Sequence, residues 1–518
     1  MTTLPSYSSD RRLAGGMILV VAAWSVVAAF GSPAWVIDLF TVDDTYLALQ
    51  VARGWAEHGF PTFDGLHRTN GFQALWGLLL WAIASCVDGA QPLVRVMLVA
   101  VALLNALAGA LLWRVGCRVF GASRTGLWIV AFWSAFCLSA RPAMIGLDNT
   151  LIAPIAAATL LAIHRLRLRP REWTGWWSTA LMLSLGCWAR LDTAVIVACV
   201  WAFLLTIAVR QRAVQQYLAA SGLLALLAIG LCGFYQWAGG SPTPVSGMVK
   251  RLIAARIEPA WNGRVIAASA LDALQFVVKH FAHGIVGMWP RWLSAVGVVV
   301  VLAVPIAAQR RGAVRAGRWT LLWLAALLLH AFVIRLWLGR YHSGTMWYYA
   351  PQNVSACVLI GFCFARMAEA GRWRRHWAIA LPAAKLALAI TALFVPATIE
   401  TNALNQYAAA RWLSENTAED ERVAAWNAGH IAYFSERTVI NLDGLVNDRE
   451  YYGLLQRGLG GESYLMEQDV RWIVDRAEGA LDKPGTVWGW LPLDKWEVVE
   501  RIGDIPALQQ IVVRRRVP

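Results

Sequence analysis

The chain has 518 residues, of which 58% are hydrophobic and only 15% are charged, and its formal net charge at pH 7 is +14. Soluble domains carry about 25% charged residues, so this composition excludes an ordinary soluble protein and predicts a polytopic membrane protein. The basic residues fall in short loops between apolar runs rather than on one soluble module, and this distribution argues against nucleic acid as a partner.

About eleven apolar runs are long enough to cross a bilayer, which takes about 17–25 helical residues. They lie near residues 15–37, 93–113, 125–142, 149–164, 174–190, 193–209, 218–237, 286–308, 319–338, 347–366 and 377–397. The first run follows two arginines and has no small-residue cleavage pattern behind it, so we expect an uncleaved anchor with a cytoplasmic N-terminus. The eight cysteines include no CxxC pair, and we expect them to pack as small apolar side chains.

One further apolar run, 72–87, is borderline in length, and its placement decides the topology of everything that follows it. If it stays at the surface or enters the membrane only partway, the arginine-rich loops all lie on the cytoplasmic side, as the positive-inside rule requires. If it crosses, the same loops lie outside. We therefore predict an α-helical polytopic membrane protein with about eleven transmembrane helices plus juxtamembrane helices. Its first extracytoplasmic loop would be 38–92, and its large outer loop 238–285.

The C-terminal part of the chain differs in kind, because its charge rises and short β-type runs alternate with helical ones. Strands are predicted at 422–426, 438–441, 471–474, 496–499 and 511–513, and helices at 428–435 and 449–459. The sequence thus predicts two domains, a transmembrane module over 1–397 and a small extracytoplasmic α/β domain over 398–518.

Two adjacent acids, Asp43 and Asp44, directly follow the first apolar run and open a helix predicted over 44–58. A carboxylate here can cap the helix, because it accepts bonds from the free N–H groups of the first turn. A cap needs only one acid, and partial dehydration of another carboxylate at a membrane surface is costly unless that group is paired or functional. Two neighbouring carboxylates can also divide acid–base work, one accepting a proton and the other orienting the nucleophile or a cation.

The predicted helix 44–58 is amphipathic. Leu47, Val51 and Trp55 recur at a spacing of four residues and form an apolar stripe. We expect this stripe to lie in the plane of the membrane interface, which would hold the acid pair at the depth of the lipid headgroups.

Other outer loops carry polar side chains that have a structural and a functional interpretation. In the loop 67–71, Asn-Gly is a turn signal, and the basic residues either are solvated or face a phosphate. Asp148 would bring a third acid to the same face, whereas Arg190 and Asp192 can also form an internal ion pair. Lys250 is a rare lysine among many arginines, and it could neutralise a leaving phosphate as a point charge.

The stretch 42–65, followed by Thr-Asn-Gly-Phe-Gln-Ala-Leu-Trp at 69–76, resembles the bacterial GT-C glycosyltransferases. These are polytopic enzymes that use polyprenyl-phosphate sugars and are related to the protein O-mannosyltransferases and the arabinofuranosyltransferases. Weaker similarities occur in the segments 146–150, 190–192, 242–250 and 441–447. Gln73-Ala74 stands where the family pattern has His-Pro.

The resemblance implies an inverting glycosyltransferase that moves a monosaccharide from a polyprenyl-phosphate donor to a cell-envelope acceptor hydroxyl. The transfer would take place on the outer face of the bacterial cytoplasmic membrane, with a glycan, lipid or protein as acceptor. Asp43 would be the general base and Asp44 its orienting neighbour, and a divalent cation at this pair is the one cofactor considered. The other candidates are Arg68, Lys250 and Arg340 for the donor phosphate; Asp148, Arg190 and Asp192 as a second acidic, orienting group; and His67, Asn70, Asn441 and Asp443 on the acceptor side.

Two alternatives from other functional classes stay open at this point. One is a transporter or flippase of lipid-linked sugars, and the other is a non-catalytic scaffold of cell-envelope assembly. Neither needs an exposed pair of acids, so substitution of these acids separates both from an enzyme.

Overall fold

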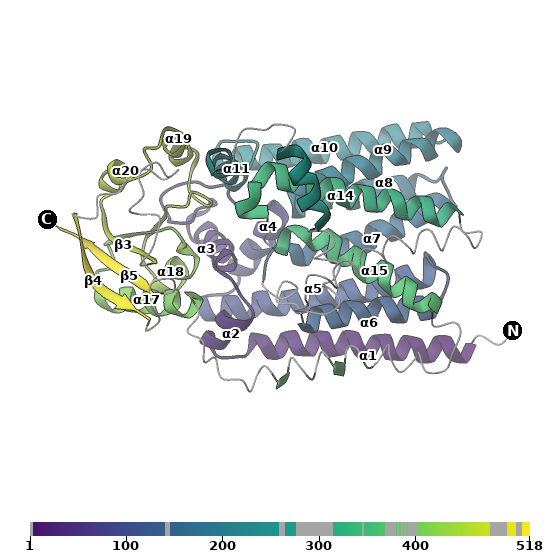
Figure 1. The fold of residues 1–518 in the computed structure, drawn as a ribbon, viewed down its shortest axis with the longest axis horizontal. Helices are drawn as coiled ribbons and strands as arrows, with labels where there is room; N and C mark the ends of the chain where they lie inside the picture. Colours follow the sequence, from purple (N-terminus) through teal and green to yellow (C-terminus); the bar gives the residue numbers. More distant parts are fainter. Residues whose placement is uncertain are drawn as a thin grey trace.

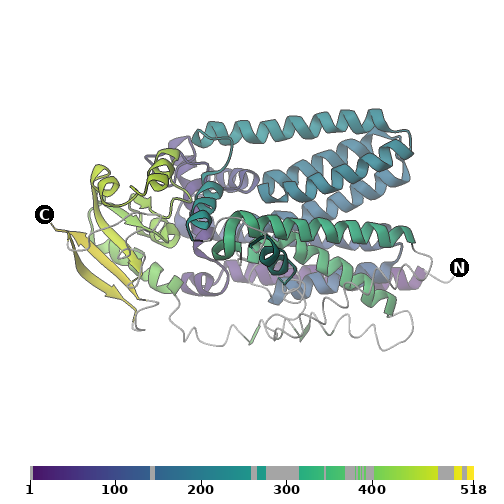
Figure 2. The same ribbon diagram turned by 45° about the horizontal axis from the view of Figure 1, so that its top comes forward.

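The computed structural model describes residues 4–139, 146–257, 265–275, 314–343, 346–367, 402–476, 495–503 and 510–517, with a few positions between 380 and 391. A bundle of long helices forms most of this part of the chain, and a small sheet domain lies at one end of the bundle (Figure 1). The described chain begins at the opposite end of the bundle, and the turned view in Figure 2 shows the same arrangement.

The helices of the bundle correspond to nine of the predicted apolar runs. They are α1 (Leu4–Ala29), α5 (Ala90–Arg118), α6 (Ser123–Ser139), α7 (Asn149–Leu168), α8 (Trp173–Ala189), α9 (Ala194–Arg210), α10 (Val214–Gly239), α14 (Val314–Ser343) and α15 (Ala350–Met367). Their buried faces share one apolar core. The predicted span 286–308 lies outside the described residues, as does nearly all of 377–397.

Among the described residues, four helices are long and apolar enough to cross a membrane. They are Ala90–Arg118, Asn149–Leu168, Leu191–Arg210, which includes a short 3₁₀ turn over Leu191–Thr193, and Val214–Gly239. The chain is therefore a helical membrane protein with a small sheet domain, while the number of eleven spans stays a prediction.

The first predicted span, 15–37, is wrong at its C-terminal end. α1 stops at Ala29, and a separate helix α2 (Pro33–Leu39) follows. Ser32 caps α2 by accepting a hydrogen bond from the backbone N–H of Trp35 at 3.3 Å, and Pro33 occupies the first helical position, where its missing N–H costs nothing.

Three shorter helices lie between the long helices and the sheet domain. They are α3 (Asp43–His58), α4 (Ala74–Ala84) and α11 (Val245–Ile257) (Figure 1). α3 matches the predicted helix and ends at Gly59, whose φ of 76° is the left-handed conformation of a C-cap. α4 has 11 residues and is about 17 Å long, roughly half of a 30 Å hydrocarbon core, so it is too short to span. The predicted outer loop 238–285 contains α11 and a second helix, Val265–Gln275.

The arginine-rich loops that the structure describes, between α5 and α6, α7 and α8, and α9 and α10, lie at the end of the bundle that is far from the sheet domain (Figure 1). α1 begins at this end, where the Asp10 carboxylate accepts a hydrogen bond from Ser123 Oγ, between α5 and α6, at 2.9 Å. Gln216, at the start of α10, donates to the backbone of Arg171, before α8, at 3.2 Å. The acidic segments at Asp43 and Asp148 lie at the opposite end, so the basic and acidic loops are separated by the length of the helices.

The C-terminal domain is a five-stranded sheet with the order β2-β1-β3-β5-β4. Its elements are α17 (Asn402–Asn416), β1 (Arg422–Ala425), α18 (Ala428–Ser435), β2 (Val439–Asn441), α19 (Arg449–Arg457), α20 (Glu462–Glu467), β3 (Val470–Arg476), β4 (Trp496–Ile502) and β5 (Ile511–Arg516). β1 is parallel to both of its neighbours, whereas β5 is antiparallel to β3 and β4. All five predicted strands are present, and so are both predicted helices. The predictions missed α17 and α20.

The prediction that the apolar stripe of α3 lies in the plane of the membrane interface is wrong. Leu47, Val51 and Trp55 are at most 6% exposed and belong to one core with residues of the C-terminal domain, among them Ile431 and Val513. An amphipathic pattern indicates that one face of a helix is buried, but it does not indicate whether lipid or protein covers that face. The C-terminal domain supplies the apolar partner surface.

Candidate active site

The candidate site begins at the first turn of α3. The preceding residue, Val42, is extended, and its N–H donates to Thr45 Oγ1 at 3.3 Å. Successive helical side chains point about 100° apart. The carboxylates of Asp43 and Asp44 therefore face different surroundings although they are neighbours in the sequence.

The Asp43 carboxylate faces the C-terminal domain. It accepts hydrogen bonds from the backbone N–H groups of Gly429 at 3.3 Å and His430 at 3.0 Å, and it lies 2.9 Å from His430 Nδ1. These N–H groups belong to the first turn of α18, whose own N-cap residue, Asn427, makes no side-chain capping bond. Asp43 thus satisfies the orphan donors of a helix that lies more than 380 residues away in the sequence.

The Asp44 carboxylate faces a pocket at the junction of the bundle and the C-terminal domain. The pocket has about 680 Å³ of space not filled by protein atoms, part of it open to solvent. Its polar lining is formed by Asp44, Gln73, Asp148, Arg190, Ser246 and Lys250. Aromatic rings, among them Trp76, Trp347 and Tyr348, supply much of the remaining wall, and Leu445 and Val446 of the C-terminal domain close one side. A pocket with an apolar wall and a few convergent charges is the usual form of a ligand site.

Burial raises the pKa of Asp44 above its ordinary value, and the Asp43 and Asp148 carboxylates raise it further, while the Lys250 ammonium opposes them. Within the described part of the chain, no group donates a hydrogen bond to the Asp44 carboxylate. Asp44 is therefore a relatively basic carboxylate with free acceptor positions beside open space.

The two cations of the pocket have different surroundings. Arg190 is buried, donates through Nε and Nη2 to the two carboxylate oxygens of Asp192, both at 3.1 Å, and donates through Nη1 to Asp148. Lys250 Nζ instead donates to the Tyr348 hydroxyl at 2.9 Å, and no described carboxylate lies within 4 Å of it. Lys250 is thus the cation of the pocket whose charge is not neutralised by direct ion pairing.

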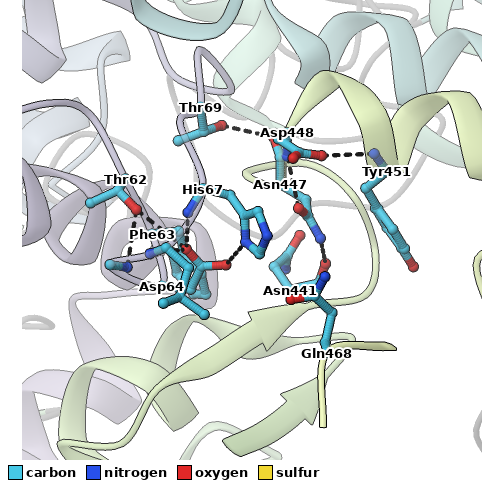
Figure 3. A network of polar contacts seen from close by, with 12 residues as sticks. Thr62, Phe63, Asp64, His67, Thr69, Asn441, Asn447, Asp448, Tyr451 and Gln468 are labelled. Carbon is cyan, nitrogen blue, oxygen red and sulfur yellow. Dashed lines mark hydrogen bonds and ion pairs between the residues drawn. The ribbon is translucent and has the colours of Figure 1, made fainter. Parts of the chain in front are cut away.

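The first part of the loop after α3, from Thr62 to Thr69, lies against the C-terminal domain (Figure 3) and does not line the pocket. His67 Nδ1 lies 2.7 Å from the Asp64 carboxylate, and this contact raises the pKa of His67. Thr69 Oγ1 donates to the carbonyl of Asn447 at 2.9 Å. Arg68 lies 4.9 Å from the ring centre of Phe60 and does not line the pocket.

Asn70 holds the turn between α10 and α11. Its Nδ2 donates to the carbonyls of Tyr235, Ser241 and Thr243 at 2.9 to 3.1 Å, and its Oδ1 accepts from the N–H of Val245 at 2.9 Å. The amide is buried and fully used by these bonds, so in this structure Asn70 shapes the loop that carries Lys250.

Asn441 and Asp443 shape the pocket wall that belongs to the C-terminal domain. The Asn441 carbonyl accepts from Asn447 Nδ2 at 2.9 Å, and Asp443 accepts from the N–H of Leu445 at 2.8 Å. Burial raises the pKa of Asp443 to about 8, and the nearby Asp43 and Asp44 carboxylates raise it as well. Neither side chain lines the pocket, but both belong to the loop whose Leu445 and Val446 do.

The structure thus brings four of the sequence candidates, Asp44, Asp148, Arg190 and Lys250, into one pocket, with Asp192 attached through Arg190. It places His67, Arg68 and Asn70 outside the lining. Arg340 lies in α14, but its side chain is outside the described residues.

The sequence analysis missed Gln73 and the pair Trp347-Tyr348 as pocket residues. Gln73 Oε1 accepts a hydrogen bond from the N–H of Leu191 at 3.4 Å, which links the first loop to the segment that carries Arg190. The departure of Gln73-Ala74 from His-Pro marked this position. Trp347 and Tyr348 lie at the start of the predicted span 347–366, and no sequence motif marks them as pocket residues.

No metal site can be assigned in the described residues. They contain no group of three or more His, Cys, Asp or Glu side chains that could hold a metal ion. The cation considered at Asp43 and Asp44 would have to be held by fewer protein ligands, together with water or substrate.

Comparisons with known proteins give a family match for the C-terminal domain and similar solved structures for most of the chain. Residues 397–516 match a family described as Domain of unknown function (DUF8728). No curated protein matches the chain. Among solved structures, the Archaeoglobus fulgidus oligosaccharyltransferase, crystallised with Zn and sulfate, has 15% identity and a TM-score of 0.43 over 97% of this chain and 75% of that one. ArnT from Cupriavidus metallidurans has 12% identity over 97% of this chain and 98% of that one, with TM-scores of 0.41 in its apo state and 0.42 bound to undecaprenyl phosphate.

Proposed function

We propose that the protein is an inverting glycosyltransferase that transfers a monosaccharide from a polyprenyl-phosphate donor to an acceptor hydroxyl. The observation that carries the proposal is the pocket in which the free Asp44 carboxylate lies with Lys250, at the end of the bundle covered by the C-terminal domain. The family resemblance of the stretch 42–76 supplies the substrate class. The reaction would take place on the outer face of the cytoplasmic membrane, with the arginine-rich end of the bundle inside.

Asp44 is the better placed of the two acids to act as general base. Its pKa is raised, so it is a stronger proton acceptor than an ordinary carboxylate, and it has space beside it for an acceptor hydroxyl. Asp43 has its carboxylate occupied by α18. The hydroxyl proton passes to Asp44 while the hydroxyl oxygen bonds to the anomeric carbon. The bond from that carbon to the phosphate oxygen breaks with both electrons going to the phosphate, which inverts the configuration.

Lys250 is the candidate group for the departing phosphate. A cation whose charge is not neutralised can stabilise the negative charge that develops on the leaving oxygens. Arg190 carries two carboxylate partners, so we assign it a structural part, orienting Asp148 at the pocket wall. Arg68 and Arg340 stay weaker candidates for contacts with the donor.

The C-terminal domain would contribute to the acceptor side of the pocket. The loops after β1 and β2 both reach the first loop of the transmembrane module, and ligands of α/β sheets commonly bind at the carboxyl ends of parallel strands. Leu445 and Val446 form the wall that an acceptor would meet.

Asp44→Asn tests the function. Purified protein in lipid nanodiscs would be given synthetic radiolabelled polyprenyl-phosphate mannose, glucose, galactose and arabinose, with membrane vesicles from cells lacking the protein as acceptor source. Because removing a positioned base costs about 10²–10⁴-fold, Asp44→Asn should lower kcat by at least about 10²-fold while binding of undecaprenyl phosphate is retained. The matched control is Asp88→Asn, an exposed carboxylate between α4 and α5 outside the pocket lining.

Two outcomes would reject the enzyme assignment. One is wild-type protein that transfers no sugar from any of the four donors. The other is full turnover by Asp44→Asn, which is what a transporter or a scaffold would show.

A further inference from the structure

We propose that Asp43 is a positioning residue: its carboxylate fastens the first turn of α3 to the first turn of α18, so that the docked C-terminal domain determines where Asp44 lies in the pocket. This inference rests on the proposed function, because it concerns the placement of the proposed base. It also makes the C-terminal domain an integral part of the active site.

The first argument is that Asp43 is committed to α18. It accepts from two successive backbone N–H groups and contacts the His430 ring, which is fully buried. The other ring nitrogen, Nε2, is buried without a hydrogen-bond partner among the described residues, so the Nδ1 contact with Asp43 is the polar contact that orients the ring. Asp43 is thus used as a remote helix cap.

The second argument is the closeness of the contact. A Cβ atom added at Gly429 would overlap the backbone oxygen of Asp43. The His430 ring lies 4.5 Å, centre to centre, from the ring of Tyr46, which is itself fully buried in the first turn of α3. The two helix ends therefore interlock through backbone, carboxylate and ring, and a shift of α18 would be transmitted to α3.

The third argument is that the side chains holding the first turn of α3 do not include Asp44: Thr45 Oγ1 accepts from the Val42 N–H at 3.3 Å, Tyr46 is fully buried, and Asp43 bonds to α18. The N-cap residue of α3, Val42, has no side chain able to cap, and the turn carries two adjacent negative charges that repel each other. Asp44 itself receives no hydrogen bond from the described residues. Its position is then set by the backbone of α3, and the bonds of Asp43 to α18 are among the contacts that fix this backbone.

Three variants measure the positioning role directly. Asp43→Ala should lower kcat by about 10²-fold, since a displacement of about 1 Å of a catalytic group has this effect, while the KM for the donor stays within about twofold. Asp43→Asn keeps an oxygen that accepts from His430 and should retain kcat within about fivefold of wild type. Gly429→Ala leaves Asp43 in place but forces the helix ends apart, so its kcat should fall as in Asp43→Ala.

Hydrogen exchange supplies a readout that does not need turnover. In Asp43→Ala and Gly429→Ala, the amides of Gly429 and His430 should exchange faster than in wild type, whereas in Asp43→Asn the His430 amide, whose acceptor oxygen is kept, should stay protected. The control is Glu57→Ala, which removes an exposed carboxylate from the other end of α3 and should change neither exchange nor kcat.

The possible failures are distinguishable. If wild type is active and Asp44→Asn is not, but Asp43→Ala has wild-type kcat per folded molecule, the positioning role is rejected and the proposed function stands. If Asp43→Asn loses as much kcat as Asp43→Ala with its His430 amide still protected, the charge of Asp43 takes part in the chemistry and positioning is again rejected. An inactive wild type rejects the proposed function, and the exchange data then still decide whether Asp43 fastens α18.

Discussion

Two surfaces of the segment formed by α3 and the loop after it differ in how their polar groups are paired, and the two adjacent acids lie on different surfaces. On the docking face, which we define by the contacts of Asp43, Thr69 and Gly71 with the C-terminal domain, polar groups are paired and backbones touch. Thr69 donates to the carbonyl of Asn447, and a Cβ at Gly71 would overlap the carbonyl of Leu445. On the pocket face, Asp44 and Lys250 border open space and are not paired directly with each other.

The comparison indicates that hydrogen bonding distinguishes a carboxylate that stabilises the fold from one that is available for catalysis. A buried carboxylate whose acceptor positions are filled stabilises the fold, and removing its partners costs free energy. A carboxylate with empty acceptor positions beside a cavity has been desolvated without that compensation, and such strain is typical of functional sites. Asp43, whose side chain is 21% exposed, has its acceptor positions filled by α18, and Asp44 receives no hydrogen bond from the described residues, as the role that we propose for it requires.

The largest effect on stability should come from substitution of Arg190. This side chain lies on the pocket face, but its polar groups are fully paired, as those of the docking face are. Arg190→Met would leave the buried Asp148 carboxylate and the partly buried Asp192 carboxylate without the guanidinium, and breaking such a cluster costs about 3–5 kcal/mol of unfolding free energy. Thermal unfolding in detergent measures this loss. The control is Arg169→Met, which breaks an exposed ion pair with Glu172 and should cost less than about 1 kcal/mol. Equal losses of stability in the two variants would show that the Arg190 cluster contributes no more to the unfolding free energy than an exposed ion pair does.

Lys250→Met should have a smaller effect on stability and a clear effect on the reaction. Loss of one electrostatic stabiliser of a transition state typically lowers kcat by about 10²–10³-fold, and Lys250→Arg, which keeps the charge, should recover part of it. The control is Arg256→Met on the same helix, because Arg256 bonds carbonyls of the C-terminal domain outside the pocket. A wild-type kcat in Lys250→Met would show that Lys250 does not stabilise the departing phosphate.

The same variant should change the pH dependence of activity. The Lys250 cation lowers the pKa of Asp44, so its removal raises that pKa, and the acid limb of the kcat/KM profile should move to higher pH. In wild type this limb should already lie above the ordinary carboxylate range, because burial raises the same pKa. A profile that stays in place in Lys250→Met would mean that the titrating base is not near this lysine.

Local patterns were enough to predict much of the fold. Alternating runs placed all five strands of the C-terminal domain, and the run 44–58 with its terminal glycine placed α3. The error at the end of the first span came from weighing hydrophobicity above Ser32 and Pro33, which begin a new helix. The stripe of α3 was misdirected because periodicity reports that a face is buried but not what covers it.

The candidate site was predictable only where residues lie at the same end of neighbouring helices. Asp44, Asp148, Arg190 and Lys250 meet because alternating spans bring their loops to one end of the bundle. The contact between Asp43 and His430 joins positions 387 residues apart, and no local signal predicts it. The division of labour that we propose for the two acids depends on this tertiary contact, which the sequence alone does not predict.

The smallest expected effect concerns Asp443, which lies between the two faces. Burial raises its pKa to about 8 from an ordinary value of 3.8, with Asp43 and Asp44 adding to the effect. Between these two values the folded state holds a proton that the unfolded state has released, so the stability contributed by this group falls as the pH rises toward 8. Asp443→Asn cannot titrate, and its melting temperature should therefore vary less than that of wild type between pH 5 and pH 8.

The measurement is the difference in melting temperature between wild type and Asp443→Asn, taken at several pH values in one detergent. This difference should change in favour of the variant up to about pH 8 and become constant above it, while Asp88→Asn should follow wild type throughout. Parallel curves for Asp443→Asn and wild type would show that Asp443 is ionised in the folded protein at neutral pH. Three neighbouring negative charges would then lie where the docking face meets the pocket, and Asp44 would need a cation beyond Lys250 to balance them.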